Sequence, residues 1–332
     1  MRALVQSSAG SPLSIAEIDL PEPGPGQVRI KVEAVGLNPV DAGLVQHGNE
    51  QWAWPHVPML DAAGTVDKLG PGVSSCSPGD RVVGHGDLRG SGAAAQYAIY
   101  DAEALAAIPA SVSAAQAAAL PCAAMTAYQA IHRRLHVQPG QHVVVTGANG
   151  GVGGFAVQLA HRAGAHVIAL ASANHQRARD LGAQSVVDYH DPDAREQILQ
   201  AAPEGISAIV DTVSAENATA NLSLLAHGGG IACIAGRADL ESLPAFGIAP
   251  SVHEIALGAA YSNGLPRHRR DLSIMLGELL AMVAEGTLDP CLSAIIAPQD
   301  LERSIVEIRE GHTQGKIVMD ASALVEAGGA AG

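Results

Sequence analysis

The sequence predicts an α/β protein in which a doubly wound parallel sheet is combined with a β-rich region. Three observations carry this prediction. An apolar, β-branched strand at 142–146 ends at a glycine cluster and is followed by a helical pattern at 152–163. Strand-like and helix-like segments then alternate to about residue 235, which is typical of βαβ units. Before them, residues 2 to about 100 form short apolar runs between Pro- and Gly-rich turns, as in a small barrel of strands.

The size and composition of the chain narrow its class. A length of 332 residues exceeds that of a usual single-core domain, so two domains are expected. The formal net charge of −14 disfavours nucleic acid and anionic membrane surfaces as partners. The four cysteines are far apart and form no CxxC pair, and no apolar run has membrane-spanning length. The sequence therefore predicts reduced thiols and a cytoplasmic protein.

The elements follow in order along the chain. In the β-rich region, apolar and charged residues alternate at 28–34, which is the period of a strand with one buried face. Ser113 is the predicted N-cap of an alanine-rich helix to about residue 135, and Pro121 is expected to break or kink it. Strands are predicted at 142–146, 167–171, 185–189, 206–211, 231–235 and near 254–260, with helices at 152–163, 175–181, 193–201, 215–225 and 271–285. The triplet at 228–230 is expected to be a turn, and a last strand at 316–319 precedes a loose tail at 321–332.

The glycine cluster contains the most informative motif. Ala148-x-Gly150-x-x-Gly153 matches the dinucleotide fingerprint, with alanine in the first glycine position. Small residues allow a tight turn, close approach of a pyrophosphate and direct packing of the helix on the strand, and the helix start offers N–H groups to the phosphates. Any strand–turn–helix corner also favours glycine, but a second strand that ends about twenty residues later favours nucleotide binding. The predicted cofactor-binding residues of this turn are Ala148, Asn149, Gly150, Gly151, Val152 and Gly153.

The end of the second strand indicates which nicotinamide cofactor is used. NAD-selective folds place Asp or Glu there for the ribose 2′-hydroxyl, whereas here the chain has no acid. Ser172, His175 and Arg177 offer donors instead, so the sequence favours NADPH. The alternative is that Arg177 and Arg179 belong to a solvated helix face.

Several stretches resemble a known family over nearly the whole chain. They are 34–41 (Ala-Val-Gly-Leu-Asn-Pro-Val-Asp), 61–66, 78–82, 120–121, 126–128, 139–141, the glycine turn and 315–318. In these stretches the chain is similar to the medium-chain dehydrogenase/reductase superfamily, and within it to the zinc-independent quinone oxidoreductase-like branch. The resemblance implies a GroES-like β-barrel catalytic domain made of residues 1–121 and 263–332. A Rossmann-type dinucleotide-binding domain is then inserted at 122–262.

The resemblance also implies roles for single residues. It places Asn38 and Thr126 near the nicotinamide as catalytic residues, Tyr189 beside the 2′-phosphate, and Gly236 and Lys316 among the cofactor-binding residues. Each catalytic candidate has a structural alternative: Asn38 precedes a proline in a turn, and Thr126 could cap or bond back within its helix.

Acidic residues near these candidates are expected to be structural. Asp41 and Asp61 are interpreted as buried acids in hydrogen-bond networks. The branch often has a tyrosine two residues after the position of Asp41, and this chain has Gly43 there, so no proton donor is identified. Trp52, Trp54 and Tyr261 are candidates for pocket lining or for core.

No metal site is predicted. Zinc members of the superfamily have a catalytic cysteine where this chain has Asn38, and a Gly-His-Glu motif where it has Met59-Leu60-Asp61. Cys122, near a helix start, is either a reactive thiol or an inert buried one.

The predicted function is an NADPH-dependent, zinc-independent reductase that transfers hydride to a quinone or an α,β-unsaturated carbonyl. The alternatives are an enoyl-thioester reductase and an NADPH-binding sensor or structural protein without turnover. The expected partner is a small electrophilic substrate, and the resemblance implies a homodimer. The basic run at 267–270 is interpreted as a solvated helix entry.

Overall fold

The computed structural model describes residues 1–262, 264–311 and 313–326, and its chain contacts divide into two units. The first unit combines Met1–Met125 with Leu257–Gly332, and the second is Thr126–Ala256. The resemblance had placed these boundaries at 121/122 and 262/263. Among the described residues, no helix is long and apolar enough to cross a membrane.

The first unit is built around a mixed sheet. Its strands are β1 (Arg2–Val5), β2 (Ser14–Glu17), β3 (Gln27–Gly36), β4 (Asp61–Leu69), β5 (Arg81–His85), β6 (Tyr97–Asp101), β7 (Ala106–Ala107), β14 (Leu292–Ile296) and β15 (Lys316–Asp320). The sheet order is β14-β15-β3-β4-β5-β7, with β6 paired to β3, and β1 and β2 form a separate hairpin. Both ends of the chain therefore supply strands to one sheet, because β15 pairs with β3.

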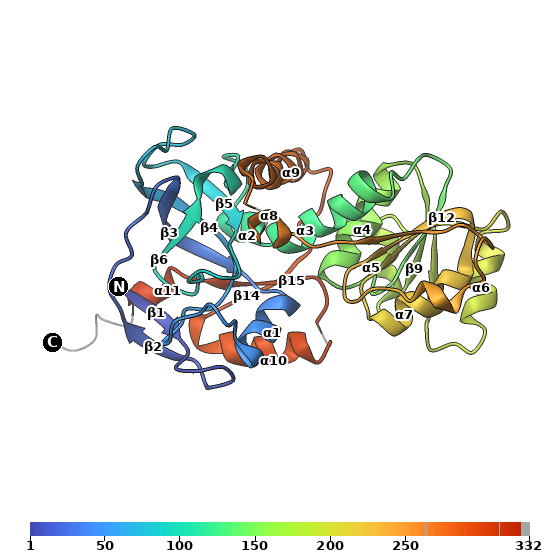
Figure 1. Cartoon of the computed structure of the whole chain (residues 1–332), viewed down its shortest axis with the longest axis horizontal. Coiled ribbons are helices and arrows are strands. Elements are labelled where there is room, and N and C mark those ends of the chain that lie inside the picture. Colours follow the sequence, from blue (N-terminus) through green and yellow to red (C-terminus); the bar gives the residue numbers. More distant parts are fainter. Residues whose placement is uncertain (263, 312, 327–332) are drawn as a thin grey trace. The chain divides into compact units, whose positions relative to one another are not determined.

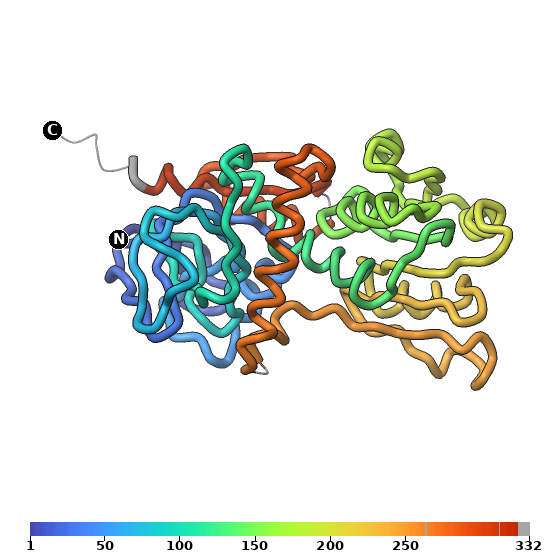
Figure 2. Tube along the Cα trace, turned by 90° about the horizontal axis from the view of Figure 1, so that it is seen from above, coloured from blue at the N-terminus to red at the C-terminus, as the bar shows by residue number. Residues whose placement is uncertain are grey.

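Helices cover this sheet. They are α1 (Pro39–His47), η1 (Ala102–Ala104), α2 (Ala114–Ala118), α3 (Pro121–Tyr128), α8 (Ala259–Ser262), α9 (Pro266–Ala284), η5 (Pro298–Asp300), α10 (Leu301–Arg309) and α11 (Ala323–Glu326). Figure 1 shows α1 and α10 side by side in the first unit, and Figure 2 shows α9 as a long tube lying beside the segment that contains η1 and β7. The helix predicted from Ser113 begins with a capping box at that residue and breaks at Pro121, as expected.

The second unit is an open parallel sheet with helical connections. Its elements are η2 (Gln129–Arg134), β8 (His142–Val145), α4 (Gly151–Arg162), β9 (His166–Leu170), α5 (His175–Asp180), β10 (Ser185–Val187), α6 (Ala194–Ala201), β11 (Ile206–Asp211), α7 (Ala215–Asn221), η3 (Leu222–Leu224), β12 (Leu225–Cys233), η4 (Leu240–Ser242) and β13 (Ser251–Glu254). The strand order is β10-β9-β8-β11-β12-β13, and every pair is parallel. This order reverses at β8, as in a doubly wound sheet. The predicted fold class is confirmed.

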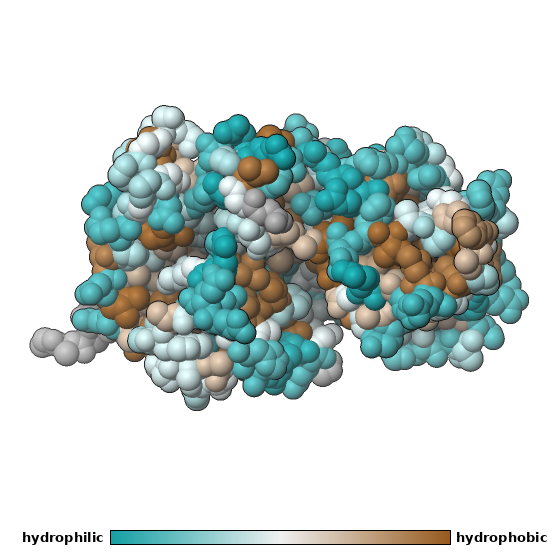
Figure 3. All heavy atoms as spheres, in the orientation of Figure 1, coloured by the Kyte–Doolittle hydropathy of each residue, from teal (hydrophilic) through white to brown (hydrophobic). Residues whose placement is uncertain are grey.

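Each unit has its own apolar core. In the second unit, buried residues of the central strands such as Val144, Ile168 and Ile209 pack with residues of α6 and α7. In the first, Val28, Ile30 and Val32 face the core, as their alternation predicted. Figure 3 shows that polar and apolar residues are interspersed on the visible surface.

Four predicted elements differ in the structure. The glycines at 228–230 lie within β12, where the pairing with β11 shifts register and Gly228 has a φ of 73°, so they form an irregular stretch of strand rather than a turn. The sixth strand is β13 at Ser251–Glu254, earlier than predicted, because residues 259–262 are helical. Helix α9 starts at Pro266 rather than 271, since proline is well suited to a first helical position. The tail expected to be loose contains α11, and its residues 327–332 lie outside the described residues.

Candidate active site

The glycine turn of the second unit has the geometry that its sequence predicts. Gly150 is the N-cap of α4 and has no side chain with which to cap it, so the first N–H groups of the helix face outward without a side-chain acceptor. A Cβ on Gly153 would lie 2.1 Å from the carbonyl oxygen of Gly147, which explains why only glycine fits there. Ala148 is fully buried, and its N–H donates to Leu170 O at 3.2 Å. Gly151 and Val152 form the first turn of α4.

Asn149 connects the glycine turn to the segment after β9. Its Nδ2 donates to Ala173 O at 2.6 Å and to Asn174 O at 3.3 Å. The side-chain oxygen Oδ1 is buried and has no hydrogen-bond partner among the described residues. An unpaired buried acceptor of this kind is costly, so it indicates a donor supplied by a ligand.

The donors predicted for a 2′-phosphate lie together at the end of β9. Tyr189 is half exposed, and its hydroxyl donates to Ser172 Oγ at 3.1 Å. His175 Nε2 lies 3.0 Å from Ala171 O. In Arg177, Nε and Nη2 are buried without a hydrogen-bond partner among the described residues. A buried guanidinium with two unpaired nitrogens is suited to an anion such as a phosphate.

Gly236 follows β12 and lies close to the start of α7. A Cβ at this position would be 2.7 Å from the backbone nitrogen of Ala215. The glycine therefore permits close packing of two segments at the carboxyl edge of the sheet, the edge where ligands bind in open α/β sheets.

Asn38 and Lys316, two residues that the resemblance linked to the cofactor, lie together in the first unit. Asn38 is the buried N-cap of α1, and its Oδ1 accepts a hydrogen bond from the Lys316 ammonium, which also donates to Leu37 O. Asn38 Nδ2 donates to Asp61 Oδ2 at 2.9 Å and to Asp41 Oδ2 at 3.2 Å. The interpretation of both aspartates as buried acids in a hydrogen-bond network is confirmed. The catalytic role of Asn38 stays a prediction.

Strand register explains why these residues meet. Gly36 at the end of β3 pairs with Asp61 at the start of β4, and Asp61 pairs with His85 at the end of β5. Along the same row, β15 brings Val318 opposite Gly36, so that Lys316 lies two residues away. His85 Nδ1 is 2.6 Å from Asp61 Oδ1, and the N–H of Cys122 at the start of α3 donates to Asp61 Oδ2 at 2.9 Å. We call Asn38, Asp41, Asp61, His85 and Lys316 the polar cluster.

The electrostatics of the polar cluster are those of buried, mutually repelling acids. Burial raises the pKa of Asp41 to about 7, the negative charge of Asp61 adds to this, and Lys316 opposes it. Burial also raises the pKa of the Cys122 thiol well above its usual value, again with a contribution from Asp61. Cys122 is therefore the inert thiol of the two alternatives.

The sequence reasoning missed His85. A single histidine after a short strand carries no motif, and only the pairing of β4 with β5 brings it to Asp61. Its backbone carbonyl accepts a hydrogen bond from Tyr261, and Trp52 Nε1 donates to Leu88 O at 2.8 Å. Both aromatic side chains thus help to fix the segment that follows β5.

Thr126 belongs to the second unit, whereas the polar cluster belongs to the first. It is buried in α3, one helical turn after Cys122, at the first residue of the second unit. Its predicted catalytic role is not tested by this geometry.

Three possible metal donors converge on the polar cluster, where they are hydrogen-bonded rather than spaced as zinc ligands. Oxygen, nitrogen and sulfur atoms of Asp61, His85 and Cys122 lie within 4.8 Å of one another. Two ligands of one tetrahedral zinc lie roughly 3.3 Å apart, whereas the Asp61–His85 contact is a hydrogen bond of 2.6 Å. The second carboxylate oxygen of Asp61 already accepts hydrogen bonds from Asn38 and Cys122, and the Lys316 ammonium donates to the same Asn38 side chain. These residues are arranged as hydrogen-bonding partners.

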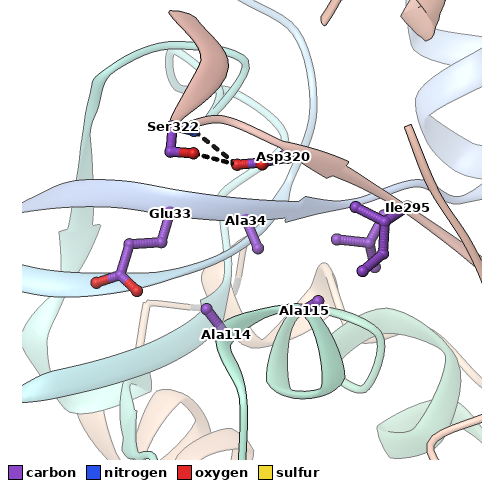
Figure 4. Close-up of a pocket in the computed structure, with 8 residues that line it drawn as sticks. Glu33, Ala34, Ala114, Ala115, Ile295, Asp320 and Ser322 are labelled. Carbon is purple, nitrogen blue, oxygen red and sulfur yellow. Dashed lines mark hydrogen bonds between the residues drawn. The ribbon is translucent and has the colours of Figure 1, made fainter. Parts of the chain in front are cut away.

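A small cavity of about 260 Å³ opens elsewhere in the first unit. Its lining residues are Glu33, Ala34, Ala114, Ala115, Ile295, Val318, Asp320 and Ser322. Figure 4 shows Ser322 hydrogen-bonded to Asp320, and the Glu33 side chain pointing away from them on the other side of the strand. Two carboxylates make this cavity unsuited to a phosphate-bearing cofactor.

Comparison with known proteins agrees with this geometry. Residues 24–110 match the alcohol dehydrogenase GroES-like domain family, and residues 151–272 match the zinc-binding dehydrogenase family. A chloroplastic quinone oxidoreductase, QR1 of Triphysaria versicolor, is 36% identical over 54% of this chain and 58% of its own length. A mycocerosic acid synthase-like polyketide synthase of Mycobacterium tuberculosis is 30% identical over 93% of this chain but only 15% of its own length. The chain thus spans less than two thirds of these relatives.

Solved structures extend the similarity to nearly the whole chain. An alcohol dehydrogenase superfamily protein from Novosphingobium aromaticivorans has a TM-score of 0.86 and 29% identity, covering 96% of this chain and 99% of that one. The CurK enoyl reductase has a TM-score of 0.83 and 25% identity, covering 96% and 98%. With the glycine turn, the sheet order and the two-part first unit, these similarities show that the chain belongs to the medium-chain dehydrogenase/reductase superfamily and is quinone oxidoreductase-like.

Proposed function

We propose that this protein is an NADPH-dependent reductase that transfers hydride, without zinc, to a quinone or an α,β-unsaturated carbonyl. The observation that carries the cofactor choice is Arg177, whose buried Nε and Nη2 have no partner among the described residues. Ser172 and Tyr189 add hydroxyls at the same end of β9, and no carboxylate stands there to repel a 2′-phosphate.

The glycine turn supports binding of the rest of the dinucleotide. The uncapped start of α4 supplies N–H groups and a positive dipole end to the pyrophosphate. The unpaired Oδ1 of Asn149 offers an acceptor next to it. Once bound, the cofactor supplies a hydride, and the protein orients it and excludes water.

A conjugated acceptor suits a site without a Lewis acid. Reduction of a simple carbonyl places the incoming charge on one oxygen, which then needs a metal or an equivalent stabiliser. A quinone or enone spreads this charge over its own π system. The hydrogen-bonded geometry of Asp61, His85 and Cys122 favours the metal-free reaction.

The cofactor choice is tested by fluorescence titration of NADPH and NADH into wild type and Arg177→Gln. Loss of a charged hydrogen-bond pair should weaken NADPH binding by roughly 10- to 100-fold and leave NADH binding unchanged. Arg179→Gln, an exposed arginine on the same helix, is the matched control. Equal affinity of the wild type for both cofactors would contradict the proposal.

An enoyl-thioester reductase is the second candidate, because an enoyl reductase and a polyketide synthase are among the similar proteins. A coenzyme A or carrier phosphate would need available cations. In the basic run at 267–270, Arg269 pairs with Asp101 at 2.5 Å and Arg270 with Glu103 at 2.7 Å. These ion pairs make the two arginines less suited to binding a phosphate. Turnover of crotonyl-CoA well above that of free enones would favour this candidate, and tight NADPH binding without turnover of any acceptor would favour a sensor.

We also propose a homodimer and a small-molecule substrate. The edge strand β13 ends the sheet of the second unit and offers unpaired backbone groups for a second copy. Light scattering after size exclusion tests this. The cytoplasmic location stays a prediction.

A further inference from the structure

We propose that His85, oriented by Asp61, is the catalytic proton donor that completes reduction of the substrate. This inference rests on the proposed function, because a hydride acceptor becomes an anion that must gain a proton. The sequence offered no donor at the position where the branch often has tyrosine, since that position is Gly43.

His85 has the geometry of a proton donor that a carboxylate holds in place. Its Nδ1 is bound to Asp61 Oδ1 at 2.6 Å, which fixes the ring and leaves Nε2 as the nitrogen that can exchange a proton. Nε2 has no hydrogen-bond partner among the described residues and is not fully sealed from solvent. A carboxylate behind an imidazole stabilises its charged form and sets its orientation, as in other acid–base pairs. Asp61 is thus the positioning residue.

The polar cluster places several charged groups out of contact with water. Asp41, Asp61, His85 and Lys316 are exposed by 1%, 0%, 3% and 3%. Two carboxylates and one ammonium leave one uncompensated negative charge, which is costly when buried. A proton held by Asp41, whose pKa burial raises to about 7, would balance this charge.

The charges of Asp61, Lys316 and His85 all act on Asp41. Hydrogen bonds through Asn38 and Asp61 connect these groups. The raised pKa of Asp41 agrees with a proton retained near neutral pH. Other titratable groups that face the cluster are Cys122 on α3, Tyr100 on β6 and Tyr261 on α8, and burial raises the pKa of each. The hydroxyl of Tyr100 already donates to Leu60 O at 2.7 Å and that of Tyr261 to His85 O, so both hydroxyl hydrogens are engaged by backbone carbonyls.

The step balances as follows for an enone. Hydride addition to the β-carbon moves the C=C π pair toward the carbonyl oxygen and gives an enolate. The Nε2–H bond of the imidazolium then breaks with its electron pair staying on nitrogen, and a new O–H or C–H bond forms on the substrate. His85 is left neutral, and solvent returns the proton.

The test is the His85→Asn variant, whose amide nitrogen can replace Nδ1 as the donor to Asp61 but which lacks Nε2. With an enone, kcat should fall by about 100-fold or more. The decrease of kcat with rising pH, which reflects the protonated form of His85 in the wild type, should disappear. Added imidazole should restore part of the rate. NADPH affinity should not change. With a tetrachloroquinone, whose hydroquinone is acidic enough to leave as an anion, the loss should be much smaller.

Two measurements keep the inference falsifiable should His85→Asn fold poorly. On the wild type, kcat with an enone should fall as pH rises, because the donor must carry its proton, and it should show a solvent isotope effect. Cys122→Ser should retain kcat, because its thiol takes no part in proton transfer. A flat pH profile, or stoichiometric zinc that is lost in both Cys122→Ser and His85→Asn, would overturn the inference.

The outcomes also separate this inference from the proposed function. If the wild type oxidises NADPH with enones and His85→Asn does so equally well, only the proton donor is wrong. If the wild type oxidises NADPH with no acceptor, the proposed function fails and the proton donor with it.

Discussion

The two candidate sites of this chain differ in how their polar atoms are satisfied. In the polar cluster of the first unit, Asn38 donates to Asp61 and accepts from Lys316, and all three are almost completely buried. At the glycine turn of the second unit, Asn149 Oδ1 and two nitrogens of Arg177 are buried without partners among the described residues. These three residues satisfy one another without a ligand, whereas the second arrangement leaves groups that a ligand would satisfy. One is suited to holding charge and protons, the other to binding.

The largest expected effect tests how far the polar cluster depends on its own cation. Lys316→Met removes the buried ammonium next to two carboxylates and should lower the free energy of unfolding by about 3–5 kcal/mol. Chemical denaturation measures this. Lys68→Met, which removes a half-exposed lysine paired with Glu22, is the control and should change stability little. Equal stability of both variants would show that the cluster is not electrostatically coupled.

Asp41 should give the cluster a pH dependence that the glycine turn lacks. Its folded pKa of about 7 lies above the unfolded value near 3.8, so the folded state binds more protons between these pH values. The contribution of Asp41 to the free energy of unfolding, roughly 2–4 kcal/mol, is therefore fully present below about pH 4. It is lost as the pH rises through 7. His56, whose pKa burial lowers to about 4, acts in the opposite direction.

The difference in the free energy of unfolding between wild type and Asp41→Asn isolates the effect of Asp41, because His56 is present in both proteins. The stability of wild type relative to Asp41→Asn should decrease from pH 4 to pH 7. A difference that does not vary with pH would contradict the coupling.

The glycine turn should instead be sensitive to volume. Gly153→Ala places a methyl group 2.1 Å from Gly147 O and should cost about 1–3 kcal/mol of stability. NADPH binding should weaken together with it, because the turn must shift. Thermal unfolding with and without NADPH measures both, and an unchanged Kd would show that the turn does not contact the cofactor.

The smallest expected effect is a gain in stability, opposite to the loss expected for Gly153→Ala. Gly277→Ala lies within α9, and a Cβ there meets no heavy atom within 4 Å. Gly277→Ala should raise the free energy of unfolding by about 0.5–1 kcal/mol, since alanine favours a helix more than glycine does. A destabilised Gly277→Ala variant would mean that loss of glycine is harmful for reasons other than close contact.

The same contrast explains what could be predicted from the sequence. The glycine turn, the parallel sheet and the donors at Ser172 and Arg177 depend on local spacing, which periodicity and turn chemistry describe well. The polar cluster depends on strands far apart in sequence, such as β3 with β15, and no local pattern specifies their register. For this reason His85 was missed, and Asp61 was considered without the histidine that pairs with it. The strand at 251–254 was misplaced because so short an element carries a weak periodic signal. The start of α9 was misplaced because Pro266 begins the helix before the apolar periodicity does.

Gly36, Asp61 and His85 lie opposite one another on three neighbouring strands. The activity of the proposed proton donor therefore depends on the correct register of β4. If β4 moved by one position, Leu60 or Ala62 would face His85 and the carboxylate would leave the row. Such a misaligned molecule would still fold its nucleotide-binding unit and retain cofactor, yet it would reduce nothing that needs a proton. A preparation that binds NADPH fully but turns over only partly would therefore carry the signature of misfolding in the barrel.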